Sequence, residues 1–176
     1  MTRRSETSAG ILAFRRRPTL AFLLAHPGGP YWRNKDQGAW SIPKGNVESG
    51  DLLACAKREF TEETGLTPTG PFIALTPLRQ KSGKMVHAFA MEADFDLRAF
   101  CSNQFEMEWP PRSGKRQSFP EIDRVAYFNA ATARRKILPG QRAFIDELIR
   151  HLNSSDRHAR PGLADPVTPS PPGAEK

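Results

Sequence analysis

Three glutamates in a segment of helical periodicity, Glu59, Glu62 and Glu63, constrain this 176-residue chain more than any other feature. In a helix that turns about 100° per residue, positions i, i+3 and i+4 lie within one sector, so the three carboxylates face one place. The apolar residues on or beside that sector are Leu52, Ala56 and Phe60. We therefore predict a helix whose acidic side chains border the protein core.

Carboxylates in this position need a compensating partner. Like charges at these spacings repel, and a carboxylate drawn toward a core loses hydration unless a cation or hydrogen-bond donors replace the water. Mg²⁺ meets this requirement, because it binds through one or two carboxylates, keeps several waters and coordinates substrate phosphates. The alternative is a solvated acidic face that Lys57 and Arg58 partly balance.

The residues before this helix add two candidate ligand-binding groups. Pro43 ends an apolar segment, and the loop that follows begins near Gly45, whose backbone carbonyl is free to supply another oxygen ligand. Glycine suits such a position because it allows a close approach of the backbone. Lys44 is either a phosphate contact or a surface lysine, and the sequence leaves both interpretations open.

The segment 58–66, Arg-Glu-Phe-Thr-Glu-Glu-Thr-Gly-Leu, resembles the second half of the Nudix box at every specified position. The full pattern is Gly, five residues, Glu, seven residues, Arg-Glu, an apolar residue, any residue, Glu-Glu, any residue, Gly and an apolar residue. A match of this length on a predicted helix, after a strand and a loop, is much more specific than an isolated glycine motif.

The first half of the box departs from the pattern. Five residues separate Gly45 from Asp51, which stands in place of Glu, and six residues rather than seven separate Asp51 from Arg58. We expect the start of the helix to absorb the missing residue. The departure affects Asp51, the first acidic position, and the support that this position would give to Arg58. Glu48 is a candidate substitute for that support.

The resemblance covers about residues 8–152 and implies an α/β fold: a Nudix-like α/β/α sandwich with a mixed β-sheet and the box as a loop-helix-loop. It also implies a Mg²⁺- or Mn²⁺-dependent pyrophosphohydrolase that cleaves a diphosphate linkage in a nucleoside diphosphate joined to another group X. Carried over by position, the implied metal ligands are Glu59, Glu63, Glu62 and the carbonyl of Gly45. Glu62 is a ligand or the base that orients the water, Arg58 orients the glutamates, and the identity of the base stays open.

Short apolar runs between turn-forming residues predict the remaining elements. We expect strands at residues 11–14, 20–25, 39–42, 72–78, 85–91 and 125–128, and helices at 51–64 and 140–152. Gly65 is predicted to end the first helix. Residues 1–7 are expected to be a flexible N-terminus, 8–152 one domain, and 153–176 a disordered Pro-rich tail.

Composition narrows the class of protein. The net charge of +7 favours polyanionic partners, and the longest apolar runs, 9–14 and 20–25, are far shorter than the roughly 20 residues that span a bilayer. No signal peptide is expected, and two cysteines, Cys55 and Cys101, predict neither a disulfide framework nor a paired metal site. We expect a soluble cytoplasmic protein without a dedicated nucleic-acid arm, because no block of five or six like charges occurs.

Residues outside the box are expected to select the substrate. Lys44 and Trp40 are the predicted substrate-binding residues, and Tyr31 and Trp32 are further candidates for stacking on a base. Packing in the core or at its rim is the alternative for each aromatic residue. Glu106 and Glu108 share one face of an alternating segment, either as extra glutamates of the site or as a solvated edge.

Two further groups have open roles. His26 and His87 are either phosphate contacts or structural residues within strands. Arg112, Lys115 and Arg116 lie in a polar stretch that we interpret as a mobile lid over phosphates.

Two functions from different classes follow from these observations. One is a metal-dependent pyrophosphohydrolase whose partner is a small phosphorylated nucleotide, for example a dinucleoside polyphosphate or a nucleoside triphosphate. Nucleic acid enters only as a capped-RNA substrate. The other is a Nudix-like regulatory module that binds a nucleotide or RNA without catalysis.

Overall fold

The computed structural model describes residues 6–48 and 50–158. Seven strands form the main sheet: β1 (Thr7–Arg15), β2 (Ala21–Pro27), β3 (Lys44–Asn46), β4 (Phe72–Ala74), β5 (Leu78–Arg79), β6 (Met85–Glu92) and β9 (Ile122–Asn129). Two more strands, β7 (Gln104–Glu108) and β8 (Arg116–Pro120), pair separately. The helices are α1 (Leu52–Thr64), α2 (Ala130–Lys136) and α3 (Arg142–His158), with short 3₁₀ helices η1 (Leu97–Ala99) and η2 (Pro139–Gln141).

Strand β1 lies within the sheet and makes it mixed. The strand order is β4-β6-β1-β2-β9, and β1 runs parallel to β6 but antiparallel to β2 and β3. The first part of β1 pairs with β3, where Ala9 lies opposite Gly45, and its last part pairs with β2, where Phe14 lies opposite Phe22. Strands β3 and β2 thus pair with different parts of β1. The pairing with β1 fixes the position of β3, the strand that carries the first glycine of the Nudix box.

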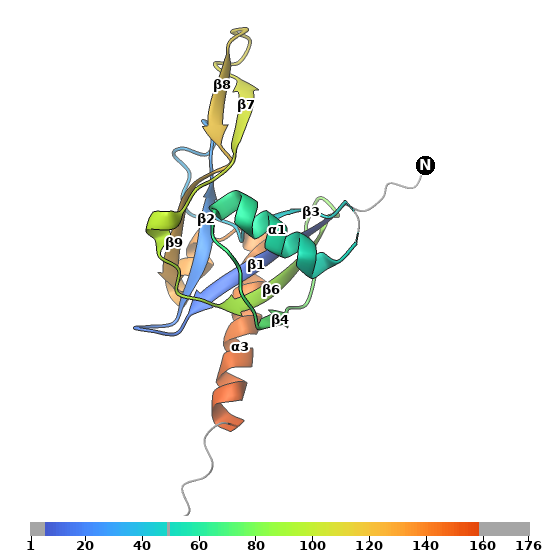
Figure 1. The fold of residues 1–176 in the computed structure, drawn as a ribbon, viewed down its shortest axis with the longest axis vertical. Coiled ribbons are helices and arrows are strands. Elements are labelled where there is room, and N and C mark those ends of the chain that lie inside the picture. The colour runs from blue at the N-terminus through green and yellow to red at the C-terminus, as the bar shows by residue number, and fades with distance from the viewer. Residues whose placement is uncertain (1–5, 49, 159–176) are drawn as a thin grey trace, which may run out of the picture.

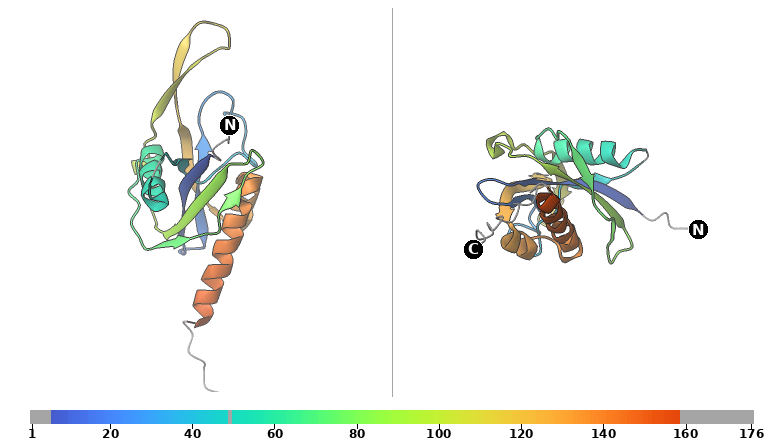
Figure 2. Two further views of the ribbon diagram at one scale, coloured as in Figure 1. Left: turned by 90° about the vertical axis from the view of Figure 1, so that its right-hand side faces the viewer. Right: turned by 90° about the horizontal axis from the view of Figure 1, so that it is seen from below.

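Alternation along β1 separates two hydrophobic cores. Ala9, Ile11 and Ala13 belong to the core under α1, whereas Leu12 and Phe14 belong to the core that includes α3. Figure 2 shows α1 on one side of the sheet and α2 and α3 on the other. The predicted α/β/α sandwich with a mixed sheet is therefore confirmed.

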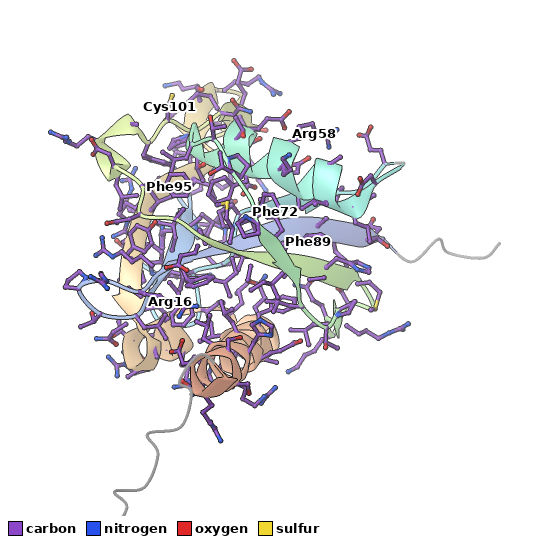
Figure 3. The ribbon with its side chains drawn as sticks, turned by 60° about the horizontal axis from the view of Figure 1, so that its bottom comes forward. Arg16, Arg58, Phe72, Phe89, Phe95 and Cys101 are labelled. Atoms are coloured by element: carbon purple, nitrogen blue, oxygen red, sulfur yellow. The ribbon has the colours of Figure 1, made fainter. Side chains whose placement is uncertain are left out.

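Helix α1 is fixed by its apolar side and by both ends. Phe60 is fully buried and its ring lies 5.6 Å from that of Phe95, one of the side chains labelled in Figure 3. The Asp51 carboxylate accepts a hydrogen bond of 2.8 Å from the backbone N–H of Leu53 and caps the start of the helix. Gly65 ends it with a φ of 71°, as the sequence predicted.

Helix α3 closes the opposite face. The predicted stripe of Phe144, Leu148 and Leu152 is buried there. Gln141 is also buried, and its side-chain oxygen accepts the backbone N–H of Ile42, which ties the segment before β3 to this layer. The helix continues to His158, so residues 153–158, where we expected the tail to begin, are helical. The rest of the expected tail and residues 1–5 lie outside the described residues. Thr7, which we expected in the flexible N-terminus, is the first residue of β1.

Strands β7 and β8 form a hairpin that projects from the main body (Figure 1). Their register places Phe105 opposite Phe119 and Glu108 opposite Arg116. The polar stretch that we interpreted as a mobile lid is therefore the end of a regular hairpin. Arg112, at its turn, has a φ of 62°, in the left-handed region.

Other differences from the sequence prediction are local. Residues 39–42 form only isolated bridges, Ala25 with Ser41 and Trp40 with Ile137, and the strand begins instead at Lys44. The predicted strand 72–78 is two short strands, β4 and β5, that both pair with β6. Helix α2 was not predicted. Within the described parts of the chain, no helix is long and apolar enough to cross a membrane.

Candidate functional site

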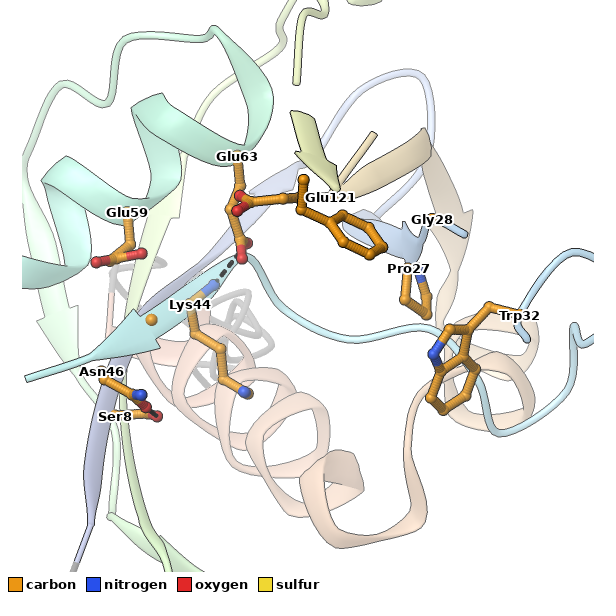
Figure 4. Close-up of a pocket in the computed structure, with 11 residues that line it drawn as sticks. Ser8, Pro27, Gly28, Trp32, Lys44, Asn46, Glu59, Glu63 and Glu121 are labelled. Carbon is orange, nitrogen blue, oxygen red and sulfur yellow. Dashed lines mark hydrogen bonds between the residues drawn. The ribbon is translucent and has the colours of Figure 1, made fainter. Parts of the chain in front are cut away.

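A cleft of about 490 Å³ lies where α1, β3, the end of β2 and the base of the β7–β8 hairpin meet (Figure 4). Two of the three box glutamates line it, together with residues that are far apart in the sequence, from Ser8 to Glu121. The lining residues are Ser8, Pro27, Gly28, Trp32, Lys44, Gly45, Asn46, Glu59, Glu63, Phe105 and Glu121.

Glu59 lies directly against the backbone of Gly45. A Cβ atom at position 45 would overlap with the Glu59 carboxylate, so a glycine is needed for this close approach. The Glu59 side chain is 17% exposed and accepts a hydrogen bond of 2.7 Å from Arg58. Two groups that the resemblance implied as metal ligands are thus adjacent.

Glu63 is the most perturbed carboxyl group of the cleft. Burial raises its pKa to about 7. The backbone N–H of Lys44 donates a hydrogen bond of 3.0 Å to this carboxylate and, with the Lys44 charge, opposes the rise, while Glu59 and Glu121 add to it. The protein therefore compensates the negative charge of Glu63 only in part, and a bound cation would complete the compensation.

Lys44 contributes through its backbone and its side chain. Its pKa is lowered by burial and then by the nearby Lys84, and the carboxylates Glu63 and Glu59 oppose this. The side chain lines both the cleft and an adjoining cavity of about 240 Å³. A cationic group in that position suits an anionic ligand.

Glu62 does not line the cleft. Its side chain is 47% exposed, and its Oε1 atom lies 3.8 Å from Nε of Arg58. Arg58 thus contacts Glu59 and Glu62 together, in keeping with the orienting role that the resemblance implied. The assignment of Glu62 as ligand or base stays a prediction.

The first acidic position of the shortened box lies at the start of α1, where we expect the missing residue to be absorbed. Asp51 caps the helix, and within the described residues Arg58 has ion pairs to Glu59 and Glu62 but to neither Asp51 nor Glu48. Instead, Glu48, Asp51 and Arg58 line a separate cavity of about 230 Å³.

Glu121 is a cleft residue that the sequence analysis missed. It follows the last residue of β8, and Figure 4 shows it beside Glu63, reaching the cleft from the opposite wall. Its negative charge raises the pKa of Glu63, which agrees with this proximity. No spacing rule links it to the box, because its position depends on the path of the chain through β8 into β9.

The three aromatic candidates for base stacking differ in their position relative to the cleft. Trp32 lines both the cleft and the adjoining cavity, where the end of β2 and the segment before β3 meet. Trp40 lines neither; it is 3% exposed, packs edge-on against Phe128 and donates its indole N–H to Asp36. The structure does not bring this predicted substrate-binding residue to the cleft. Tyr31 is 57% exposed.

The remaining candidates lie outside the cleft. Glu106 and Glu108 are on the projecting hairpin, where Glu106 pairs with Arg116 and Glu108 accepts the backbone N–H of Gly114. His26 is fully buried, with Nδ1 2.8 Å from Asp123 and Nε2 2.6 Å from the Lys35 carbonyl. His87 lies in β6 and does not line the cleft.

The chemistry of the donors fits Mg²⁺ or Mn²⁺. In the described part of the chain, no three His, Cys, Asp or Glu side chains are already arranged to hold a metal ion. The available donors are hard oxygen atoms of Glu59 and Glu63, beside the backbone of Gly45. Gly45 lies within β3, opposite Ala9 of β1, and not at the start of a loop as the sequence predicted, so its carbonyl as a further ligand stays a prediction. Such a partial set suits a cation that takes its other ligands from water and substrate phosphates.

The fold and the cleft define an α/β/α protein in which carboxylates from one helix meet the backbone of a neighbouring strand. A family model described as NUDIX domain matches residues 4–148. The chain belongs to the Nudix family.

Two solved structures share this fold. The NUDIX domain of Shewanella oneidensis NrtR in complex with ADP ribose is 13% identical, with a TM-score of 0.60, and covers 86% of this chain and 90% of its own. A Caenorhabditis elegans Ap4A hydrolase binary complex is 17% identical, with a TM-score of 0.57, and covers 84% of this chain and 98% of its own. At these identities the likeness concerns the fold alone.

Part of this chain is similar in sequence to an RNA pyrophosphohydrolase of Caulobacter vibrioides. It is 40% identical over an alignment of 57 residues, and the match covers 29% of this chain. The match spans only about a third of that protein (33%).

Proposed function

We propose that this protein is a divalent-metal-dependent pyrophosphohydrolase that cleaves a diphosphate linkage in a nucleoside diphosphate joined to another group. The observation that carries the proposal is the contact of Glu59 with the backbone of Gly45, in a cleft that also holds the incompletely compensated carboxylate of Glu63. The two unpaired cysteines, buried Cys55 and exposed Cys101, agree with a cytoplasmic location.

In this proposal Glu59, Glu63 and the Gly45 carbonyl hold Mg²⁺ or Mn²⁺. When bound, such a cation neutralises charge on the pyrophosphate and lowers the pKa of a coordinated water. Glu62 is retained as a further ligand or the base, and Glu121 is the additional carboxylate on the opposite wall of the cleft.

The other residues of the cleft position the substrate. Arg58 holds the carboxylates of Glu59 and Glu62, and Lys44 presents a positive charge to the phosphates. Trp32, rather than buried Trp40, is placed to pack against a base or sugar. Keeping these groups fixed before the substrate binds lowers the entropic cost of in-line attack.

The relatives suggest the substrates to test first. RNA, Ap4A and ADP ribose follow from the names of the relatives. We choose RNA with a 5′-triphosphate as the RNA substrate, and other dinucleoside polyphosphates, nucleoside triphosphates and nucleotide sugars complete the panel. Release of phosphate or pyrophosphate is measured with Mg²⁺, with Mn²⁺ and with a chelator. We expect metal-dependent turnover of one substrate class.

The decisive comparison uses Glu63→Gln against Glu92→Gln. Glu92 is half-exposed at the end of β6 and pairs with Arg16, away from the cleft, so its change is a matched loss of one carboxylate. Turnover that disappears in Glu63→Gln but persists in Glu92→Gln supports the hydrolase. Nucleotide binding without turnover of any substrate would instead support the regulatory binding module.

A further inference from the structure

The β7–β8 hairpin and the segment after β2 pack together into one projecting structure, which we call the arm: residues 28–35 and 104–120. At its base, the backbone N–H of Gly28 donates a hydrogen bond of 2.8 Å to the Glu121 carbonyl. Further out, a Cβ atom at Gly29 would lie 3.1 Å from the ring of Phe105. Beyond this, the rings of Tyr31 and Trp109 meet edge to face at 5.3 Å.

The two faces of the hairpin differ in chemistry. Alternation places the apolar side chains on the face that contacts segment 28–35: Phe105, Met107, Trp109 and Phe119. The two carboxylates of the hairpin, Glu106 and Glu108, fall on the other face. Because Phe105 also lines the cleft, the apolar face begins at the candidate active site and runs outward from it.

Positive charge accompanies these aromatic residues. Neither segment 28–35 nor the hairpin end at 109–117 contains an acidic residue, whereas both contain exposed cations. Arg33, Arg112 and Lys115 have no ion pair among the described residues, and Lys35 lies over the ring of Trp32 at 4.7 Å. Tyr31 is exposed, and Trp32 and Trp109 are half-buried. Accessible rings beside cations without ion pairs are typical of surfaces that bind single-stranded nucleic acid, where bases stack and phosphates meet Lys or Arg.

We infer that the arm binds a single-stranded nucleotide chain whose 5′ end occupies the cleft. This inference rests on the proposed function and names its group X, which is the rest of an RNA chain. Trp109 lies four residues beyond Phe105, about 13 Å along the strand, so a ligand that reaches both is longer than the part held in the cleft. The expectation of no dedicated nucleic-acid arm was based on blocks of consecutive like charges, whereas the cations of this surface come from two separate segments.

The test measures binding in the absence of divalent cations, so that turnover does not interfere. The probe is a fluorescent octaribonucleotide with a 5′-triphosphate, followed by anisotropy, and a nucleoside triphosphate serves as the short competitor. Two arm variants are compared with wild type, Tyr31→Ala/Trp109→Ala and Arg112→Ala/Lys115→Ala. The control, Arg150→Ala/Arg157→Ala, removes two exposed charges from α3, at the other end of the molecule (Figure 1).

We expect Tyr31→Ala/Trp109→Ala to raise the Kd for the octanucleotide at least about fivefold, as loss of one stacked base would. Arg112→Ala/Lys115→Ala should also raise this Kd, through loss of phosphate contacts. The affinity of the short competitor should change less than the affinity of the octanucleotide. In Arg112→Ala/Lys115→Ala, the slope of log K against log salt should fall by about 1.4, corresponding to two phosphate contacts. The control should match wild type in both measurements.

Three results would overturn the inference. One is equal weakening of long and short ligands, and another is wild-type octanucleotide affinity in both arm variants. The third is a dimer in sedimentation that the arm variants dissociate, which would make the arm an interface between copies of the chain. The charge variant changes only exposed side chains, so the test stands even if the aromatic variant does not fold.

The outcome is separable from that of the proposed function. Length-dependent binding that needs the arm, without turnover of any substrate, supports the arm and contradicts the hydrolase. Metal-dependent turnover that is insensitive to chain length and to the arm variants supports the hydrolase and contradicts the role of the arm.

Discussion

Ionisation of Glu63 should destabilise the metal-free protein. Burial holds its pKa at about 7 in the folded state, against 4.5 for the unperturbed group. Between these values the folded protein binds more protons than the unfolded chain, so stability decreases as pH rises from about 4.5 to 7 and then levels off. At 1.36 kcal/mol per pKa unit, the shift corresponds to about 3 kcal/mol at and above neutral pH.

The assay is urea unfolding of wild type and Glu63→Gln between pH 4.5 and 8 in a chelator. Gln keeps the shape of the side chain without a charge, so the variant should be the more stable protein near neutral pH, and the difference should shrink toward pH 4.5. Added Mg²⁺ should stabilise wild type more than the variant, and its affinity for wild type should decrease below pH 7 as protons compete. A pH-independent difference between the two proteins, or a wild type that gains stability from pH 4.5 to 7 relative to the variant, would refute the reasoning.

Three further substitutions test the packing around the cleft. Gly45→Ala should lower kcat/KM about 100-fold by displacing Glu59, whereas Gly140→Ala, whose Cβ meets nothing within 4 Å, should keep wild-type steady-state kinetics. Asp51→Ala should cost about 1 kcal/mol in urea unfolding through loss of the helix cap, with kcat/KM unchanged; a large loss of activity would contradict its separation from Arg58. Phe60→Ala, at a fully buried ring, should cost about 3–5 kcal/mol by the same measurement, and a cost below 1 kcal/mol would show that α1 does not depend on this core.

Periodicity predicted the parts of the fold that depend on one buried face. The stripe of Phe144 and Leu148 and the post-helix Gly65 are local signals, and the structure confirms them. The hairpin β7–β8 was not predicted as an element, because neither of its strands is buried against the main sheet and its residues remain exposed or half-buried. Helix α2 spans only Ala130–Lys136, too short for a recognisable apolar period.

The candidate site also contains residues that the sequence predicts and residues that only the tertiary structure brings together. Glu59 and Glu63 are one helical turn apart, so their common direction follows from sequence alone, and both line the cleft. The position of Glu121 depends on tertiary structure, which places the start of β9 beside α1. For Trp40, residue type suggested a ligand contact, but its burial results from neighbours on β9 and at the end of α2 that no local pattern reveals.

Asp51, at the first acidic position of the shortened box, lies outside the cleft and has no ion pair to Arg58 among the described residues. The helix begins immediately after Asp51, whose carboxylate is engaged by the backbone N–H of Leu53, so the first acidic position supports the helix end. The Arg58 guanidinium instead contacts Glu59 and Glu62, which lie three residues apart on α1. The pairing of β3 with β1 fixes the backbone of Gly45, and α1 brings Glu59 directly against it, so this close approach is present in a chain whose box is one residue short.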